Sequence, residues 1–195
     1  METKESCFFR ALYEVAVTIN SSLEPRDVLK AIVQSTASAL GAKGCSIMLL
    51  SPDRRELRHG VDFGLSDWYI RKGPVNVDLS MAEALEGRSV AVLDAGHDPR
   101  VQYGPQNVQE GIASILSVPI RLRGEVIGVM RVYTARPTEF TQGEIEFVEA
   151  VANLGAIALE NARRHDEVQY NFDQISRYIY SDTWISQMWG AEKSR

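Results

Sequence analysis

The segment from Gly111 to His165 constrains the fold of this 195-residue chain more than any other. Two apolar runs, from Ser114 to Leu122 and from Glu125 to Thr134, flank the short turn Arg123-Gly124. This arrangement predicts an antiparallel hairpin. The second run is apolar on both faces, which is typical of a central strand covered on both sides. Its apolar residues are Val126, Ile127, Val129, Met130 and Val132.

The rest of this segment predicts a long helix. Thr141 and Glu144 form a capping box, in which each side chain bonds to the other residue's backbone amide. Apolar and small residues then recur at helical spacing along one side. They are Ile145, Val148, Val151, Ala152, Gly155, Ala158, Leu159 and Ala162.

The residues before Gly111 predict alternating helices and strands. Apolar spacing and turn residues predict two helices, over about 7–20 and 25–40, followed by a hairpin with strands 45–50 and 56–63. Ser66 predicts the cap of a short helix, and Ser80 with Glu83 predicts a second capping box. A strand over 89–93 and a short helix over 105–110 complete the order. The whole order predicts an α+β fold, with an antiparallel sheet and helices on both faces.

Composition narrows the class of protein. The net charge of −5 argues against a nucleic-acid surface. Cys7 and Cys45 make no disulfide framework, which favours a reducing cytoplasm. No window has the length and apolarity of a membrane span, and the N-terminal charges do not suit a signal peptide. The expected protein is therefore cytoplasmic, without membrane or nucleic-acid partners.

The chain resembles the GAF domain family, which includes bacterial small-molecule sensor modules, over roughly Leu12 to His165. The matching pieces share the order and spacing of that family. They are Cys45-Ser-Ile-Met-Leu-Leu, Asp94 with Asp98-Pro99-Arg100, Ser114-Ile-Leu-Ser-Val-Pro-Ile120, Gly124-Glu-Val-Ile-Gly128, Pro137-Thr-Glu-Phe140 and Ala152-Asn-Leu-Gly-Ala-Ile-Ala-Leu-Glu-Asn-Ala162.

The resemblance implies a central antiparallel sheet of about six strands. The terminal helices pack on one face, and short helices and loops roof a pocket on the other. It further implies a small-molecule ligand, a homodimer built from the terminal helices and a downstream signalling protein as partner. The expected domains are residues 1–165 as the GAF domain and residues 166–195 as a helical extension for dimerisation or docking.

This sequence lacks the residues that the best-known ligands and reactions of the family require. Cyclic-nucleotide members carry an Asn-Lys pair, which is absent from this sequence. Bilin-binding members carry a cysteine in the pocket roof, where neither Cys7 nor Cys45 is expected. Free methionine sulfoxide reductases need a reactive thiolate, whereas Cys45 lies in an apolar strand. His59, His97 and His165 have no metal-ligand spacing. We therefore expect no catalytic or metal site and identify no cofactor, with the reductase as the third-ranked hypothesis.

The resemblance and the strand alternation together suggest which side chains face a ligand. Alternation places Ser46, Met48 and Leu50 on one face of their strand, and the resemblance makes this the pocket face. The predicted ligand-binding residues are Ser46, Met48, Phe63, Trp68, Ile70, His97, Tyr103, Ser117 and Arg131.

Each of these assignments has a structural alternative. Arg131, in an apolar strand, is a counter-ion for a carboxylate or phosphate, the partner of an internal salt bridge, or a guanidinium that extends to the sheet edge. Ser114 and Ser117 either contact the ligand or bond to backbone near Pro119. The aromatic residues of the roof either stack on a planar ligand or form the core of their short helices, and His97 is either a ligand contact or a solvated loop residue.

The C-terminal residues favour a contact with protein rather than a solvated tail. Val168, Phe172, Ile175 and Ile179 follow the spacing of a short coiled-coil seam. The aromatic residues beyond them suit docking on the domain or on a second subunit. The leading hypothesis is a non-enzymatic sensory module that binds a small molecule and dimerises. An interaction module with a vestigial pocket is the alternative.

Overall fold

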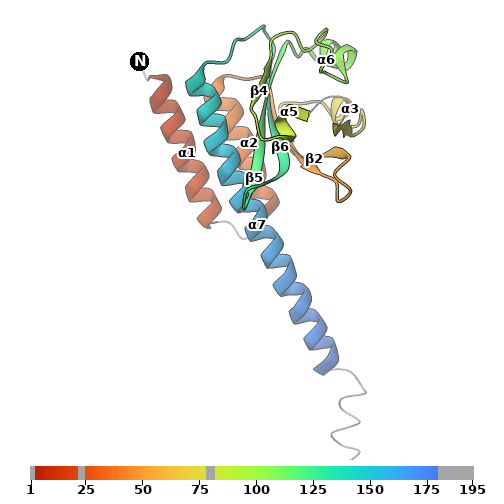
Figure 1. Ribbon diagram of the computed structural model, residues 1–195. Helices are drawn as coiled ribbons and strands as arrows, with labels where there is room; N and C mark the ends of the chain where they lie inside the picture. The colour runs from red at the N-terminus through yellow and green to blue at the C-terminus, as the bar shows by residue number, and fades with distance from the viewer. Residues whose placement is uncertain (1–2, 22–24, 78–81, 180–195) are drawn as a thin grey trace, which may run out of the picture. The chain divides into compact units, whose positions relative to one another are not determined.

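The computed structural model of the chain describes residues 3–21, 25–77 and 82–179. The helices follow the order predicted from the apolar spacing (Figure 1). They are α1 Lys4–Ser21, α2 Pro25–Leu40, α3 Asp67–Ile70, α5 Ala82–Leu85, α6 Gly104–Glu110 and α7 Gln142–Ile179. The strands are β1 Gly44–Leu50, β2 Glu56–Phe63, β3 Val75–Asn76, β4 Val90–Val92, β5 Ser114–Leu122 and β6 Glu125–Thr134.

The strands form one six-stranded sheet in the order β3-β2-β1-β6-β5-β4, and every pair is antiparallel. The predicted α+β class and the central place of β6 are therefore confirmed. The two strands that the family signature contains, β5 and β6, have the predicted bounds. The short edge strand β3 was not located from the sequence, because two residues carry no alternation.

The turn between β5 and β6 has the conformation that its residues suggest. Arg123 and Gly124 both have positive φ, at 54° and 89°. A two-residue hairpin turn of this kind matches the right-handed twist of the flanking strands. Beyond this turn and one register shift at Ile120, Arg131 of β6 pairs with Ser117 of β5, and on its other side it pairs with Ser46 of β1.

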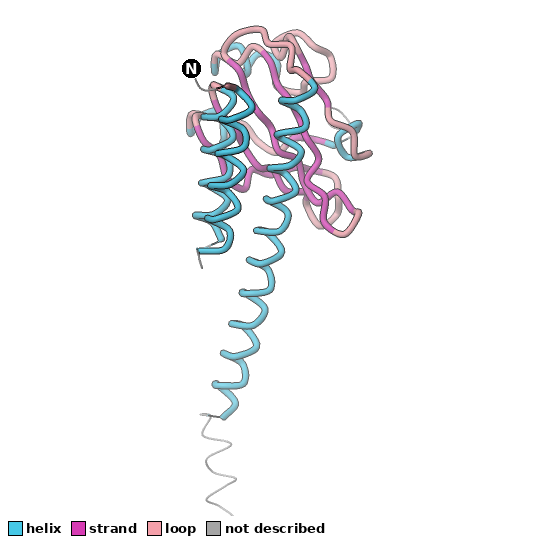
Figure 2. Tube along the Cα trace, turned by 90° about the vertical axis from the view of Figure 1, so that its left-hand side faces the viewer, coloured by secondary structure: helices cyan, strands magenta, loops and turns pink. Residues whose placement is uncertain are grey.

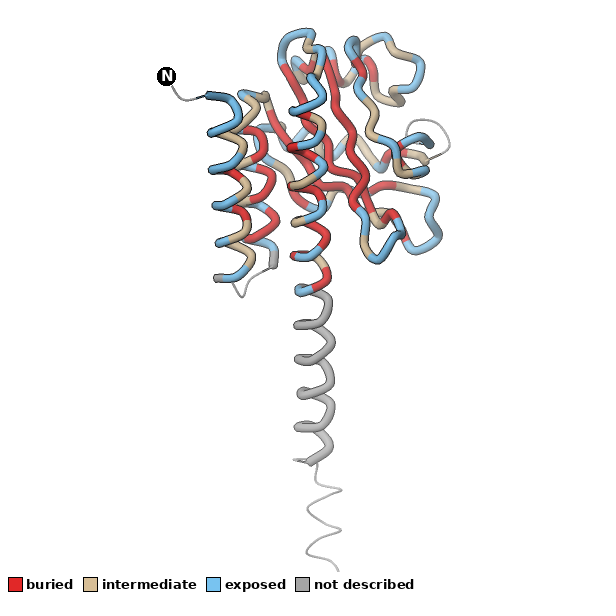
Figure 3. The backbone as a smooth tube through the Cα atoms, turned by 60° about the vertical axis from the view of Figure 1, so that its left-hand side comes forward, coloured by how far each residue is buried: buried red, intermediate tan, exposed pale blue. Residues whose placement is uncertain are grey.

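Helices α1, α2 and the part of α7 up to Leu159 lie on one face of the sheet (Figures 1 and 3). Ile32 of α2, Ile47 of β1 and Val148 of α7 are fully buried in the core that joins these layers. Phe8 of α1 stacks on Phe147 of α7 with ring centroids 4.4 Å apart. The terminal helices therefore pack together on the sheet, as predicted.

The start of α7 shows the predicted capping box. The Thr141 amide donates to a carboxylate oxygen of Glu144 at 2.7 Å, and the Glu144 amide donates to Thr141 Oγ1 at 3.3 Å. Glu144 also accepts a bond from Lys4 Nζ at 2.6 Å. Burial opposes ionisation, but these bonds prevail and hold the pKa of Glu144 below its usual value. Glu144 thus links α7 to α1 and also caps the start of α7.

The opposite face of the sheet is covered by short elements (Figure 1). Figure 2 views the molecule with α1, α2 and the start of α7 in front of the sheet. We call the residues 65–77 and 94–112, which include α3, β3 and α6, the roof. Ser66 caps α3, since its side chain accepts a hydrogen bond from the Tyr69 amide at 3.2 Å. Ser80, the predicted first residue of a capping box, lies outside the described residues.

The contacts divide the chain into Met1–Leu159 and Glu160–Arg195. The backbone of α7 is helical to Ile179. The side chains of the predicted seam and the aromatic residues after Ile179 lie outside the described residues. The predicted division of the chain after residue 165 remains a prediction.

Candidate ligand-binding site

The sheet has two faces of different chemistry, because successive side chains of a strand point to opposite sides. On the helix side, β1 and β6 present Cys45, Ile47, Met130 and Val132, all within the apolar core. On the roof side the same strands mix apolar with polar side chains. Those residues are Ser46, Met48, Val129, Arg131 and Tyr133.

A buried polar layer joins this sheet face to the roof. The hydroxyls of Ser46 and Tyr133 lie 2.9 Å apart. Tyr69 of α3 meets Tyr133 edge to face, with ring centroids 6.1 Å apart, and donates its hydroxyl to Asn107 Oδ1 at 2.7 Å. Asn107 Nδ2 in turn donates to the Ala95 carbonyl at 2.8 Å. Burial raises the pKa of both tyrosines, so their hydroxyls stay protonated and can act as donors.

Arg131 lies within this layer at the centre of the sheet. Its side chain is buried, at 6% exposure, between the paired positions Ser46 and Ser117. Its positive charge favours the ionised form of the Tyr133 hydroxyl, but burial outweighs this effect and raises the pKa of Tyr133. The guanidinium places a positive charge on the roofed face.

Lys72, in the turn after α3, adds a second basic group above Arg131. Its Nζ atom lies 3.4 Å from the Tyr69 ring centroid and 5.6 Å from that of Tyr103. It also donates to the Tyr69 carbonyl at 3.0 Å. Burial, followed by repulsion from Arg131, lowers the pKa of Lys72 to about 7. Lys72 is thus a cation whose charge changes near neutral pH.

His59 of β2 completes the basic cluster, with Nε2 3.4 Å from Lys72 Nζ. A β-bulge at Gly60 turns His59 to this face, because Val61 pairs with Ile47 while His59 pairs with Met48. Burial, with repulsion from Lys72 and Arg131, lowers the pKa of His59 to about 4. Its buried Nδ1 has no hydrogen-bond partner among the described residues.

Two spaces adjoin this cluster. An inner cleft, bordered by Tyr69, Lys72, Tyr103 and Arg131, is too narrow for a water molecule. An outer hollow of about 520 Å³ is open to solvent. The outer hollow is lined by Trp68, Arg71, Lys72 and Gln106. Lys72 borders both spaces and separates the outer hollow from the cleft.

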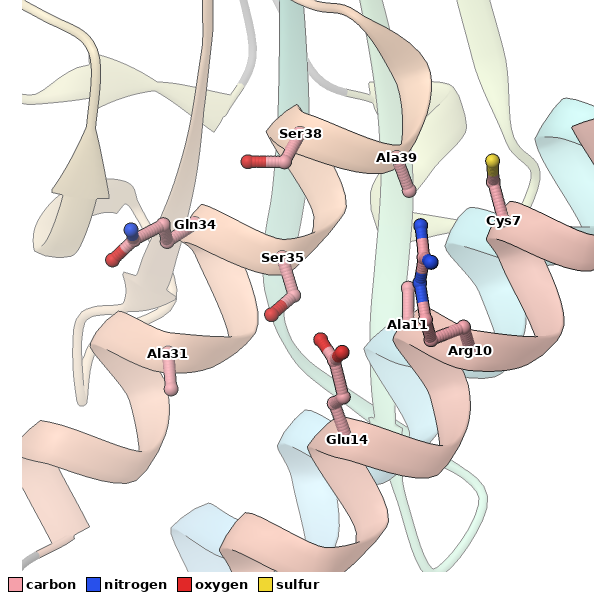
Figure 4. A pocket seen from close by; sticks show the side chains of 9 residues that line it. All are labelled: Cys7, Arg10, Ala11, Glu14, Ala31, Gln34, Ser35, Ser38 and Ala39. Carbon is pink, nitrogen blue, oxygen red and sulfur yellow. The ribbon is translucent and has the colours of Figure 1, made fainter. Parts of the chain in front are cut away.

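A third hollow lies on the other side of the sheet, between α1 and α2 (Figure 4). It measures about 340 Å³ and is lined mainly by small side chains, with Arg10 and Glu14 at its α1 side. Cys7 lies at the α1 border of this hollow. The described residues bring no aromatic ring to its lining.

The structure gathers part of the set predicted from the sequence. Ser46, Met48, Ser117 and Arg131 share the roofed face of the sheet. Tyr103 faces it from the roof, and its hydroxyl donates to the Pro74 carbonyl at 2.9 Å.

The other predicted residues lie further out. Ile70 packs, partly buried, against the Tyr69 and Tyr133 cluster. Trp68 borders the outer hollow and, like Phe63, is substantially exposed. His97 is exposed and lies 3.0 Å from Asp94.

Several residues of the site were missed from the sequence, above all Lys72, His59, Tyr133 and Asn107. In the sequence, Lys72 resembles an ordinary solvated lysine before Gly73. Only the packing of α3 turns its side chain toward the Tyr69 ring. Ser114, by contrast, donates to the Leu93 carbonyl and accepts from the Thr138 amide, so it bonds to backbone but not near Pro119 as predicted.

The thiol of Cys45 is not placed for nucleophilic chemistry. Cys45 is fully buried on the helix side, where burial raises its pKa far above the usual range. A thiol of this kind is a poor nucleophile. The described residues contain no group of histidine, cysteine and acidic side chains that could hold a metal ion. Among the helices in the described ranges, none has the length and apolarity that a membrane crossing requires.

Comparison with known proteins agrees with this architecture. The family model "GAF domain" matches residues 24–159. A GAF domain of a phosphoenolpyruvate-protein phosphotransferase from Coxiella burnetii superposes with a TM-score of 0.73 at 20% identity, covering 82% of this chain and 96% of that one. The free methionine-R-sulfoxide reductase of Neisseria meningitidis gives 0.67 at 15% identity, covering 80% and 90%.

Two curated relatives are regulatory proteins by name. The chain is 26% identical over 150 residues to a methyl sulfide methyltransferase-associated sensor of Methanosarcina acetivorans, covering 70% of this chain. It is 25% identical over 155 residues to a Nif-specific regulatory protein of Azospirillum lipoferum, covering 73%. It spans only 15% and 24% of these two relatives. The match over residues 24–159 and the six-stranded roofed sheet establish that the chain belongs to the GAF domain family.

Proposed function

We propose that this GAF domain is a non-enzymatic sensory module that holds a small molecule between the sheet and the roof. The observation that carries the proposal is the contrast between the two faces of β1 and β6. The helix side of these strands is apolar, whereas the roof side carries Ser46, Arg131 and Tyr133 within a closed interior. Burying such groups costs free energy that an apolar core would avoid. Few convergent polar groups in an apolar setting are typical of small-molecule sites.

The roof would have to move for a ligand to enter, because the inner cleft is too narrow for water. The roof consists of short elements, and α3 has only 4 residues. A ligand that binds an opened roof better than the closed one shifts the population toward the open form. This shift, passed across the sheet to α1, α2 and α7, would be the signal.

The names of the relatives support a sensory role. One is a sensor and the other a regulatory protein, and both contain a region similar to this chain. This chain spans only 15% and 24% of these two relatives. We therefore propose that the module acts on a downstream signalling protein or domain.

We also propose that the module forms a homodimer through its helices. Phe9, Tyr13 and Val17 follow at intervals of four along α1, so they form one stripe, and they are 75%, 64% and 46% exposed. Ile157 of α7 is 49% exposed. A row of large exposed apolar side chains on a helix marks a protein contact. A second copy of this chain would cover the α1 stripe and Ile157 in both subunits, because a two-fold interface uses the same surface twice.

The second candidate is a dimerisation module with a vestigial pocket, favoured by the closed inner cleft. A thermal-shift screen with a library of common metabolites separates the two candidates. We expect at least one compound to raise the melting temperature by about 3 °C or more, because a ligand at saturation stabilises the folded state. This shift should be lost in Tyr103→Ala at the roof and kept in Val108→Ala, an exposed position on α6. A library without any stabilising compound would favour the vestigial pocket.

A further inference from the structure

Resting on the proposed function, we propose that the ligand is an anion whose carboxylate or phosphate group binds between Lys72 and Arg131. Its remaining part would occupy the outer hollow lined by Trp68, Arg71 and Gln106. The site and its chemical class follow from how the basic groups are placed around the inner cleft.

The first observation is the juxtaposition of like charges. Lys72 and Arg131 border the same closed cleft, and His59 lies 3.4 Å from Lys72. Each of the two cations lowers the pKa of His59, and Arg131 lowers that of Lys72. Like charges held together away from water repel each other and destabilise the empty site. An anion placed between them would relieve this repulsion.

The second observation is the set of contacts that Lys72 makes. Its Nζ atom contacts a backbone carbonyl, a histidine nitrogen and two tyrosine rings, none of which is a carboxylate. Glu110 of α6 favours the charged form of Lys72, but more weakly than burial and Arg131 oppose it. Glu110 is also bound to the Ser66 amide at 2.9 Å and lies 3.9 Å from Lys43. It is thus already engaged away from the cleft.

The third observation is the position of Lys72 between the two spaces. Its side chain borders both the outer hollow and the inner cleft. A ligand in the outer hollow would reach Lys72 first. Arg131 would become accessible once the ammonium leaves the face of the Tyr69 ring. An ammonium is attracted to an aromatic face, and a carboxylate or phosphate can replace that attraction.

This arrangement couples anion binding to the protonation of Lys72. An anion needs the charged form of Lys72, and binding therefore raises its pKa from the value of about 7 in the empty site. Below that pH the group is already charged and contributes no pH dependence. Above it, binding must take up a proton. The other titratable and charged groups that face Lys72 are His59, Tyr69, Tyr103, Glu110 and Arg131. The pKa of His59, about 4, and the raised pKa of Tyr69 keep the charge of these two groups constant between pH 7 and 9.

The test measures binding of succinate and of inorganic phosphate by calorimetry at low salt, with the neutral diamide of succinate as control. The carboxylate and phosphate arms distinguish the two kinds of anionic ligand. We expect at least one anion to bind and the diamide not to bind. For succinate, the association constant should fall about tenfold for each pH unit above 7, because one proton is taken up.

Charge-removing variants localise the effect. Lys72→Met keeps the aliphatic stem on Tyr69, and we expect it to weaken anion binding at least about tenfold and to abolish the pH dependence. Arg71→Met, a matched change at the exposed neighbour in the same hollow, should weaken it less than about threefold. The pH series on the unmodified protein remains decisive if a variant fails to fold.

Equal losses in Lys72→Met and Arg71→Met would overturn the proposal, as would diamide binding as tight as succinate binding. Failure of both anions to bind would also overturn it. If the metabolite screen then yields a neutral ligand, the proposed sensory function stands and only the anionic class is wrong.

Discussion

Replacing Gly128 by alanine is expected to destabilise the domain by about 3 kcal/mol or more. Gly128 lies in β6 opposite Leu49, and a Cβ atom there would come 2.3 Å from the Met48 carbonyl oxygen. That oxygen belongs to the backbone of the central strand β1, so it cannot move without disturbing the hydrogen bonds between β1 and β6. Urea unfolding followed by circular dichroism measures the loss as a lower midpoint.

Gly143→Ala is the matched control for this change. Gly143 lies in the first turn of α7, and a Cβ atom there meets nothing within 4 Å. Because alanine restricts the unfolded chain and favours a helix, this change should stabilise the domain by up to about 1 kcal/mol. A Gly128→Ala protein as stable as the unmodified one would show that β1 and β6 do not approach as closely as described.

Replacing Phe9 by lysine is expected to raise the dimer dissociation constant about 100-fold or more, since it removes an apolar side chain and places two cations across the two-fold interface. Phe9 is 75% exposed in the single chain, so the change should leave the melting temperature of the monomer almost unaffected. Sedimentation equilibrium over about 1–100 µM measures the dissociation constant directly.

Val108→Lys provides the control for the dimer experiment. Val108 is 59% exposed, but it lies on α6 in the roof, on the other face of the sheet from α1. Its replacement should leave the dimer intact. If the unmodified protein sediments only as a monomer at tens of micromolar, or if both variants weaken association equally, the helical interface is wrong.

Much of the fold could be predicted because its signals are local. The turn Arg123-Gly124 fixes a hairpin through two residues with positive φ, and Thr141 with Glu144 fixes a helix start through two hydrogen bonds. The alternation of β1 also placed Met48 and Leu50 on one face, although the side that this face covers came from the family resemblance. The turn and the helix start depend on residues close together in the sequence, so they can be predicted without knowledge of tertiary packing.

The candidate site depends on features that have no local signal. His59 faces the roof because one extra residue, Gly60, shifts the register against β1. Lys72 turns inward because its ammonium group lies over the rings of Tyr69 and Tyr103. These two tyrosines are 34 residues apart in the sequence. Arg131 stood out in the sequence because a charge in an apolar strand is costly, yet its neighbours could not be named. A site assembled from separate loops is therefore visible only in the fold.

Hydrogen exchange tests most directly the central claim that the roofed face binds the ligand. The protein is compared with and without the strongest compound of the metabolite screen, and peptide masses report which amides are protected. We predict that the ligand slows exchange in residues 65–77 and 94–112, which form the roof. Exchange around the hollow between α1 and α2 should not change. Protection confined to that hollow, around Arg10 and Ser35, would contradict the claim.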